Sequence, residues 1–234
     1  MNLVVEARGL SRTYRKGRLT VHAVSDVDLA LAPGEILGVE GRSGSGKSTL
    51  LRLLMGVERP DAGEILRDGR PAERRPPPGW AMPVFQDARG SLDPRWPLWR
   101  TVAEPLIPTT GDKAARRAAA EDWLTRVGLA HLDPHARPTV LSSGQCQRVA
   151  IARALIAGPR VVFADEPTAG LDTTTAAGIT RLLRTAADEH GTALVVVSHD
   201  ADRLAVLADR VARMESGRLM GEGAGGQRVR RDGL

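Results

Sequence analysis

The stretch GRSGSGKST, residues 41–49, constrains the fold more than any other feature of the chain. An apolar segment, EILGVE, precedes it, and an apolar helical pattern, LLRLLMG, follows it. The stretch fits the spacing G-x-x-x-x-G-K-[ST], in which backbone N–H groups wrap around phosphates at the start of a helix. The chain has only three lysines, so a lysine at the required position is a specific signal. The stretch therefore predicts a strand, a phosphate-binding loop and a helix.

Other short apolar segments rich in β-branched residues predict further strands. These segments are Leu3–Ala7, Val21–Leu31, Ile36–Glu40, Met82–Phe85, Arg160–Ala164, Ala193–Ser198 and Arg210–Met214. Helical patterns lie between several of them, one ending at Gly56 and another, capped by Asp172, ending at Gly191. This alternation predicts the α/β class with a central, largely parallel sheet. The early strands, divided by the turns APGE and PDAGE, are expected to form antiparallel hairpins.

The middle of the chain has a different pattern. Between about 91 and 157 it shows little strand character and much helix, with Asp112 before a helix that runs to Val127 and Asp133–Pro134 as a cap and first-turn pair. We therefore predict a single domain over residues 1–222, with core segments 1–90 and 158–222 and an inserted helical lobe at about 91–157. Residues 223–234 are expected to form a flexible tail.

The composition is that of a soluble globular protein, and it bears on which kinds of partner the chain is expected to bind. The net charge is +5 and the pI near 10.2, but the basic residues are nearly all scattered arginines, which favours a solvated surface over a nucleic-acid-binding stripe. Two local basic clusters, at 67–79 and 228–231, are interpreted as a surface loop and part of the tail. The single cysteine, Cys146, excludes an internal disulfide and a cysteine-based zinc site. No secretory signal pattern or spanning segment is evident, so any membrane role is expected to be peripheral.

An acidic pair ends the predicted strand RVVFADEPT, at Asp165 and Glu166. In isolation the pair fits a helix cap followed by a surface acid as well as it fits a functional pair. Together with a phosphate loop it fits a Mg²⁺ partner followed by a general base for an attacking water. In the loop itself, Lys47 is positioned to reach the β- and γ-phosphates and Ser48 to ligand Mg²⁺.

Five further motifs occur in a characteristic order. They are an aromatic residue at Tyr14, VFQD with Gln86, LSSGQCQR from Leu141 to Arg148, AGLD ending at Asp172, and VSHD with His199. With the phosphate loop and the acidic pair, they resemble the ATP-binding subunits of ABC transporters over about residues 3–222. The resemblance implies an ABC ATPase domain, with a RecA-like P-loop NTPase core, an antiparallel β subdomain and the helical lobe. It also implies a Mg²⁺-dependent ATPase whose cofactors are ATP and Mg²⁺.

The resemblance assigns roles residue by residue. It implies catalysis by Glu166, His199 and Gln86, and Mg²⁺ binding by Ser48, Gln86 and Asp165. The implied nucleotide-binding residues are Tyr14, Gly41, Arg42, Ser43, Gly44, Ser45, Gly46, Lys47, Ser48, Thr49, Ser142, Gly144, Gln145 and Asp172. From the residues alone, alternative roles stay open. Tyr14 could be a packing or exposed residue, Gln86 an ordinary loop residue and His199 a neutral cap residue. Cys146, one place past the signature motif, is interpreted as a small helix residue.

The signature LSSGQ departs from the usual LSGGQ pattern at Ser143. If the backbone there required a positive φ, serine in place of glycine would cost on the order of 1 kcal/mol. On that condition we expect a weakened signature and a rise in ATPase activity on Ser143→Gly. The resemblance also implies a head-to-tail dimer, in which Ser142 and Gly144 contact the γ-phosphate of the partner's ATP.

The segment 84–106, VFQDARGSLDPRWPLWRTVAEPL, is similar to the dipeptide, oligopeptide and nickel import subfamily, and more to its second ATPase subunit. This similarity implies a second, non-identical ATPase subunit, two transmembrane permease subunits and, indirectly, an extracytoplasmic solute-binding protein. The expected location is peripheral, on the cytoplasmic face of the membrane, with no nucleic-acid partner. The alternatives are soluble ABC ATPases of DNA repair, chromosome organisation or translation, and an ATPase of phosphonate breakdown.

Overall fold

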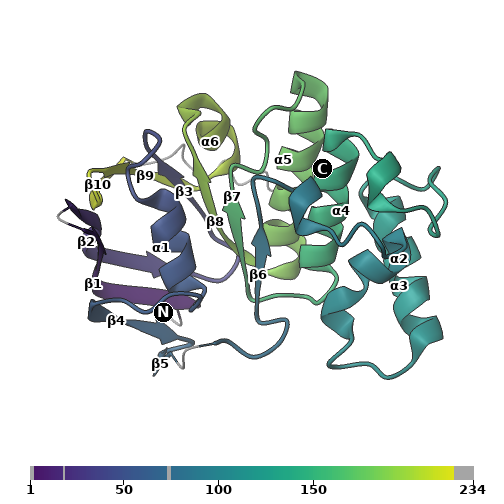
Figure 1. Ribbon diagram of the computed structural model, residues 1–234, viewed down its shortest axis with the longest axis horizontal. Coiled ribbons are helices and arrows are strands. Elements are labelled where there is room, and N and C mark those ends of the chain that lie inside the picture. Colours follow the sequence, from purple (N-terminus) through teal and green to yellow (C-terminus); the bar gives the residue numbers. More distant parts are fainter. Residues whose placement is uncertain (1–2, 18, 73–74, 224–234) are drawn as a thin grey trace, which may run out of the picture. The chain divides into compact units, whose positions relative to one another are not determined.

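The computed structural model describes residues 3–17, 19–72 and 75–223. These residues form two compact units. The first runs to Arg75 and resumes at Ala193, and the second extends from Pro76 to Thr192 (Figure 1). The second unit contains the predicted helical lobe, whose own boundaries stay a prediction.

The first unit contains an antiparallel sheet in the order β2-β1-β4-β5. Its strands are β1 (Val5–Lys16), β2 (Leu19–Leu31), β4 (Ala62–Arg67) and β5 (Arg70–Pro71). The same unit holds a mixed set of strands, in which β3 pairs in parallel with both β8 and β9, and β9 pairs antiparallel with β10. These strands are β3 (Ile36–Glu40), β8 (Ala193–Ser198), β9 (Arg210–Glu215) and β10 (Arg218–Gly223). The helices of this unit are α1 (Lys47–Leu54) and α6 (Ala201–Leu207).

The second unit combines a parallel strand pair with helices. The strands are β6 (Ala81–Val84) and β7 (Val161–Asp165), and the α-helices are α2 (Leu98–Val102), α3 (Lys113–Arg126), α4 (Ser143–Leu155) and α5 (Thr173–His190). Three short 3₁₀ helices join them, η1 (Arg89–Ser91), η2 (Glu104–Leu106) and η3 (Pro138–Val140). Helices α2 and α3 lie side by side and pack with α4 (Figure 1). Their shared core is apolar and includes Leu98, Val102, Leu124, Cys146 and Val149.

Several predicted elements agree closely with the structure. The strands Ile36–Glu40 and Ala193–Ser198 have the predicted bounds, and every residue of β8 is buried, as expected for a continuous apolar run. Helix α5 ends at Gly191, which adopts a left-handed conformation, and Asp172 caps its start. Asp112 likewise caps α3. The antiparallel pairing of the first two predicted strands is also confirmed, whereas β4, which pairs antiparallel with β1, was not predicted as a strand.

Other predictions were wrong in detail. No helix follows Asp133; its carboxylate instead accepts a hydrogen bond from the His135 backbone N–H, which closes a local turn. The turn APGE leads into β3, whose partners are parallel, so it closes no hairpin. Arg67, expected in a surface loop, is buried at the end of β4, where its guanidinium donates to the Leu54 carbonyl. The basic cluster 228–231 and nearly all of the expected tail 223–234 lie outside the described residues.

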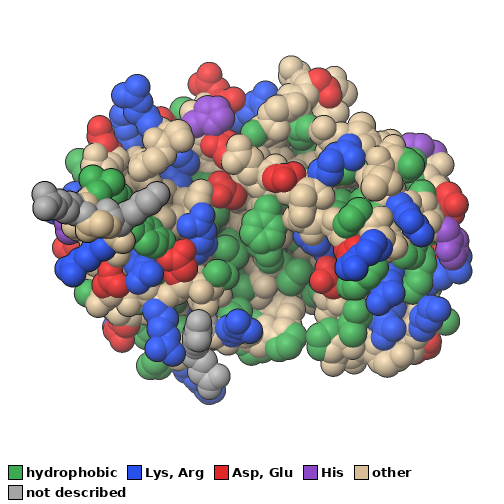
Figure 2. Space-filling view, viewed as in Figure 1, with side chains coloured by type: hydrophobic (Ala, Val, Ile, Leu, Met, Phe, Trp, Pro, Cys, Tyr) green, Lys and Arg blue, Asp and Glu red, His purple; other side chains and the backbone are tan. Residues whose placement is uncertain are grey.

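On the face drawn in Figure 2, basic side chains are interspersed with acidic ones. This mixture agrees with the interpretation of the positive charge as solvated surface. Among the described residues, no helix has the length and apolar character needed to cross a bilayer.

Candidate functional site

The phosphate loop connects β3 to α1 and leaves the start of that helix open. Gly46 occupies the N-cap position with φ of 109°, and no side chain caps α1, whereas α3, α4 and α5 each have a side-chain cap. A Cβ on Gly46 would lie 2.0 Å from the Ala23 carbonyl oxygen, so the loop accepts only glycine there. An uncapped helix start leaves N–H groups and a positive dipole end for an anion.

Lys47 and Ser45 complete the loop's polar interior. The Lys47 ammonium is buried and donates to the carbonyl oxygens of Gly41, at 2.6 Å, and Arg42, at 3.1 Å. An ammonium has three donors, and these carbonyls engage two of them. Among the described residues, the buried Ser45 hydroxyl has no hydrogen-bond partner. The loop thus holds a buried cation and an unsatisfied polar group that a phosphate would satisfy.

The histidine of VSHD leaves the neighbouring strand at the same end. Strands β3 and β8 are parallel, with Glu40 opposite Ser198, and the Gly41 N–H donates to the Ser198 carbonyl at 3.3 Å. His199 therefore follows directly after a residue that contacts the phosphate loop. The carboxyl ends of parallel strands are the usual place for ligands in α/β sheets.

In the second unit, the predicted Gln86 and the acidic pair also share one end of a strand pair. Strands β6 and β7 are parallel with Val84 opposite Ala164, so Gln86 and the Asp165–Glu166 pair both lie at the carboxyl end of this strand pair. Glu166 has φ of 48°, a left-handed conformation that non-glycine residues rarely adopt. Such backbone outliers persist where the surrounding structure imposes them, often at functional sites.

The signature motif forms the first turn of α4. Ser142 is the N-cap, and its hydroxyl accepts from the Gln145 N–H while the Gln145 side chain accepts from the Ser142 N–H, a complete capping box. Ser143 is the first helical residue and is absent from the described residues with positive φ. The condition for backbone strain is therefore not met, and the expected weakening of the signature loses its physical basis.

The signature turn lies against the start of α5. A Cβ on Gly144 would come within 2.8 Å of the Thr175 Cγ2, so this close approach requires glycine. Asp172 caps α5 by accepting from the Thr175 N–H at 2.9 Å. This hydrogen bond is the main cause that lowers the pKa of Asp172 below its ordinary value of 3.8. The structure therefore brings together the predicted residues Ser142, Gly144, Gln145 and Asp172.

Cys146 follows the signature and points into the helical core. It is fully buried, and this burial raises the pKa of its thiol, while its Sγ lies 3.9 Å from the Pro138 carbonyl oxygen. Its interpretation as a small helix residue agrees with this environment.

Sequence reasoning missed residues that hold the predicted ones. The Arg89 guanidinium donates to the carbonyl oxygens of Thr139 and of Leu141, the first residue of the signature, and Arg153 of α4 donates to the Ser91 carbonyl at 2.7 Å. The Glu58 carboxylate accepts a hydrogen bond from the Tyr14 hydroxyl. No spacing rule marks these residues, because each contact joins segments about 40 to 60 positions apart.

The predicted Mg²⁺ ligands Ser48, Gln86 and Asp165 all carry oxygen atoms, the kind of donor that Mg²⁺ prefers. No group of three or more His, Cys, Asp or Glu side chains within the described residues is arranged to hold a metal by itself. Mg²⁺ is commonly bound by one or two protein oxygens, water and substrate phosphates. A serine hydroxyl, a glutamine and one carboxylate are oxygen donors of this kind.

The family model for ABC transporters matches residues 24–169. The chain belongs to the ABC transporter family. Its relatives include a probable D,D-dipeptide transport ATP-binding protein, DdpF, of Escherichia coli K12, at 43% identity over 86% of this chain and 63% of that protein. A nickel import ATP-binding protein, NikE, of Rhodospirillum rubrum is 39% identical over 95% of this chain and 84% of its own. The lipoprotein-releasing system ATP-binding protein LolD of Shewanella oneidensis is 38% identical, with coverages of 93% and 96%.

Solved structures of ABC cassettes have the same fold. The ATP-binding cassette MJ0796, in a dimeric post-hydrolysis state bound to ADP and Pi, has a TM-score of 0.84 and 30% identity over 94% of this chain and 98% of its own. CbiO1 of Clostridium perfringens, part of the ABC transporter complex CbiONQ, has a TM-score of 0.83 and 29% identity, with coverages of 96% and 89%. The predicted fold class, an α/β P-loop NTPase with the ABC ATPase fold, is confirmed.

ABC family membership establishes the general activity. The chain is an ATP-binding subunit that energises a transporter, and its family implies ATP hydrolysis, dimerisation of cassettes and permease partners. Because the family model and these relatives are named for transport or lipoprotein release, they do not support the alternative of a soluble ATPase of DNA repair, chromosome organisation, translation or phosphonate breakdown.

Proposed function

We propose that the chain is one of two non-identical ATPase subunits of an importer of peptides, nickel or a similar small solute. The segment SLDPR at 91–95, which follows the VFQD glutamine, carries this proposal. Two relatives named for D,D-dipeptide transport and nickel import support it. The chain would act on the cytoplasmic face of the membrane, bound to two permease subunits that receive solute from an extracytoplasmic binding protein.

Relatives named LolD favour a second candidate, a system that releases lipoproteins. They match nearly the whole chain at similar identity, so overall similarity does not separate the two. The solute would contact the permease subunits and not this chain. The identity of the permeases is therefore what separates the two candidates.

The phosphate loop would bind ATP and meet the charge that develops during phosphoryl transfer. Backbone N–H groups of residues 41–49 would surround the β- and γ-phosphates, and the buried Lys47 would exchange loop carbonyls for phosphate oxygens. Ser48, Gln86 and Asp165 would hold Mg²⁺, which neutralises phosphate charge when bound. Tyr14 would stack on the nucleotide base.

Hydrolysis would begin with an attacking water. Glu166 would accept the proton of that water as general base, and His199 would donate to the γ-phosphate. The signature residues Ser142 and Gly144 would contact the ATP held by the partner subunit. Closure on two ATP molecules and reopening after hydrolysis would move the permeases between their two access states.

A pull-down tests the proposal most directly. The tagged chain is recovered from detergent-solubilised native membranes, co-purifying proteins are identified by mass spectrometry, and Mg-ATPase activity is measured. Two multi-span proteins with a second, different ATPase support the importer. Permeases recovered with this chain as the only ATPase would contradict the heteromeric assignment, and their identity would test the LolD-type alternative.

Substitution of the predicted base tests the mechanism in the same complex. Glu166→Gln is expected to retain ATP binding and abolish turnover, because the amide cannot accept the proton. The matched control is Glu215→Gln, a change of the same chemistry at an exposed position of β9, which is expected to hydrolyse ATP normally. Normal turnover in Glu166→Gln would remove Glu166 as the base.

A further inference from the structure

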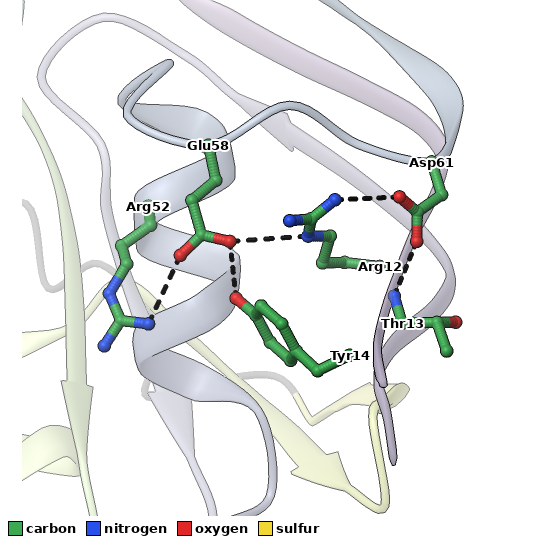
Figure 3. Close-up of polar contacts among 6 residues, drawn as sticks. All are labelled: Arg12, Thr13, Tyr14, Arg52, Glu58 and Asp61. Atoms are coloured by element: carbon green, nitrogen blue, oxygen red, sulfur yellow. Dashed lines mark hydrogen bonds and ion pairs between the residues drawn. The ribbon is translucent and has the colours of Figure 1, made fainter. Parts of the chain in front are cut away.

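The ring of Tyr14 is held in place by a carboxylate from a distant segment (Figure 3). Its hydroxyl donates to Glu58 Oε2 at 2.5 Å, within the range of charge-assisted O–H···O⁻ bonds. The Glu58 side chain is only 21% exposed, so the bond is partly shielded from water. A tyrosine with a free hydroxyl would retain rotamer freedom, whereas this bond selects one direction for the ring.

An arginine covers one face of the same ring. The Arg12 guanidinium carbon lies 5.1 Å from the Tyr14 ring centroid, in the range of a cation–π contact. Arg12 is held there by Asp61, at 2.8 Å from its Nη1, and by Glu58, at 3.4 Å from its Nε. Asp61 in turn accepts from the Thr13 N–H at 2.7 Å, a bond that is the main cause of its lowered pKa. Arg12 is thus fixed against one face of the ring, so a base that stacks on Tyr14 would use the opposite face.

Glu58 also links the ring to the helix that follows the phosphate loop, through both its backbone and its carboxylate. The Glu58 N–H donates to the Arg52 carbonyl of α1 at 3.2 Å, and Arg52 Nη1 lies 3.4 Å from Glu58 Oε1. Helix α1 begins at Lys47, directly after the phosphate loop. The helix that would bind the phosphates at its start therefore fixes the direction of Tyr14 near its end.

We propose that Glu58, together with Arg12, is a positioning residue that fixes Tyr14 as a stacking platform for the nucleotide base. This inference rests on the proposed function, in which Tyr14 stacks on the base of ATP. Because Glu58 engages the hydroxyl, the platform offers its π-face and no polar group to the base. The base is therefore bound by stacking, and the distance between base and phosphates is set by the link through α1.

Two ligands separate base binding from phosphate binding. Dissociation constants for ATP and for inorganic tripolyphosphate, which has no base, are measured by titration calorimetry on the purified full chain. Tyr14→Phe removes only the hydroxyl, and Glu58→Ala removes its acceptor. Each is expected to weaken ATP binding about 3- to 10-fold. Neither is expected to change tripolyphosphate binding, and the double variant is expected to be no weaker than the single ones, because both remove one interaction.

Two matched variants control for charge and folding. Glu58→Gln keeps an acceptor oxygen and is expected to bind ATP with an affinity between those of the native chain and Glu58→Ala. Glu64→Gln, at an exposed position of β4 where the acid pairs with Arg8, is expected to bind both ligands as the native chain does. If Glu58→Ala fails to fold, Tyr14→Phe and Glu58→Gln still test the proposal.

Tyr14→Ala separates this inference from the proposed function. It removes the platform and is expected to weaken ATP binding roughly tenfold or more, with tripolyphosphate unaffected. If that loss occurs but Tyr14→Phe binds ATP like the native chain, or the two single effects add in the double variant, positioning by Glu58 is refuted and base stacking stands. If Tyr14→Ala has no selective effect, Tyr14 is not the base platform and both statements fail.

Discussion

The backbone at Glu166 is strained in a way that separates stability from activity. Its φ of 48° is accessible to glycine at little cost, whereas a residue with a Cβ pays about 1 kcal/mol or more there. Glu166→Gly and Glu166→Ala both remove the carboxylate, so both are expected to lack turnover. Denaturant unfolding should find the glycine variant more stable than the alanine variant by about 1 kcal/mol. Equal stabilities, or a more stable alanine variant, would show that the left-handed conformation is not imposed at this residue.

At Ser143 the structure reverses an expectation from the sequence. The residue begins α4 with an ordinary helical backbone, so glycine there relieves no strain. Ser143→Gly is expected to leave ATPase activity of the assembled complex unchanged, with a stability loss of a few tenths of a kcal/mol because glycine is the poorer helix former. A clear rise in ATPase activity would contradict this account.

The next residue behaves differently because α5 is close to it. Gly144→Ala would place a Cβ 2.8 Å from the Thr175 Cγ2, and such overpacking destabilises by about 1–3 kcal/mol. Thr175→Ser removes that methyl group and keeps the backbone N–H that Asp172 caps. Thermal unfolding of the double variant should recover part of the stability that Gly144→Ala loses. No recovery would mean that the methyl group is not the obstacle.

At the scale of elements, the cap of α5 gives a pH-dependent contribution to stability. The pKa of Asp172 is lowered, chiefly by the Thr175 N–H, so folding favours the ionised carboxylate. This contribution is present above the ordinary pKa of 3.8 and is lost as the pH falls through the lower pKa of the folded state. Asp172→Asn keeps a capping oxygen without this titration, and Asp172→Ala removes both.

Melting temperatures of the three proteins across acidic pH test the cap. At neutral pH the alanine variant should melt lowest and the asparagine variant close to the native chain. The gap between the native chain and Asp172→Ala should narrow as the pH falls below about 4. A gap that stays constant would indicate that the Asp172 charge contributes nothing to the cap.

An element could be predicted from the sequence when its buried residues formed a clear hydrophobic pattern. Strand β8 is a continuous apolar run ending before a histidine and was predicted with its bounds, because every side chain is buried. Strands β4, β5 and β10 were missed, and β4 and β10 each hold one apolar pair among charged residues and glycines. Strand β1 continues well past the predicted Ala7, where bulges and half-buried side chains remove the alternation. Asp133 closes a turn because the same side chain serves turns and helix caps equally well.

Site residues could likewise be predicted only where they form a pattern within a short stretch of sequence. The phosphate loop was predictable because its chemistry requires glycines and a lysine within nine consecutive residues. The contact between Tyr14 and Glu58 was not predictable, because 44 positions separate them and only folding brings the segment after α1 against β1. Local motifs therefore predict ligand-binding groups, and the fold shows which other groups hold them in place.

At the scale of the whole molecule, the incomplete site argues for assembly. The signature turn of α4 is closed by its own capping box. Under the proposed function, this turn contacts the γ-phosphate of ATP bound to a second cassette and no ligand bound to its own chain. On the face drawn in Figure 2, the basic side chains of this +5 chain are interspersed with acidic ones, and no basic stripe is seen on that face. The proposed partner is thus another cassette, and whether it is identical to this chain decides which kind of transporter the chain serves.

Dimerisation of the hydrolysis-deficient chain answers that question. Glu166→Gln should hold ATP without turning it over, so any dimer closed around ATP should persist during size-exclusion chromatography with light scattering. If the proposed importer is correct, the chain alone stays monomeric with ATP, and a dimer forms only when the second ATPase from the pull-down is added. Lys47→Ala, which weakens phosphate binding, should abolish that dimer and serves as the control. A stable ATP-dependent dimer of this chain alone would contradict the heteromeric importer and favour a symmetric cassette pair, because one surface would then complement itself across a two-fold axis.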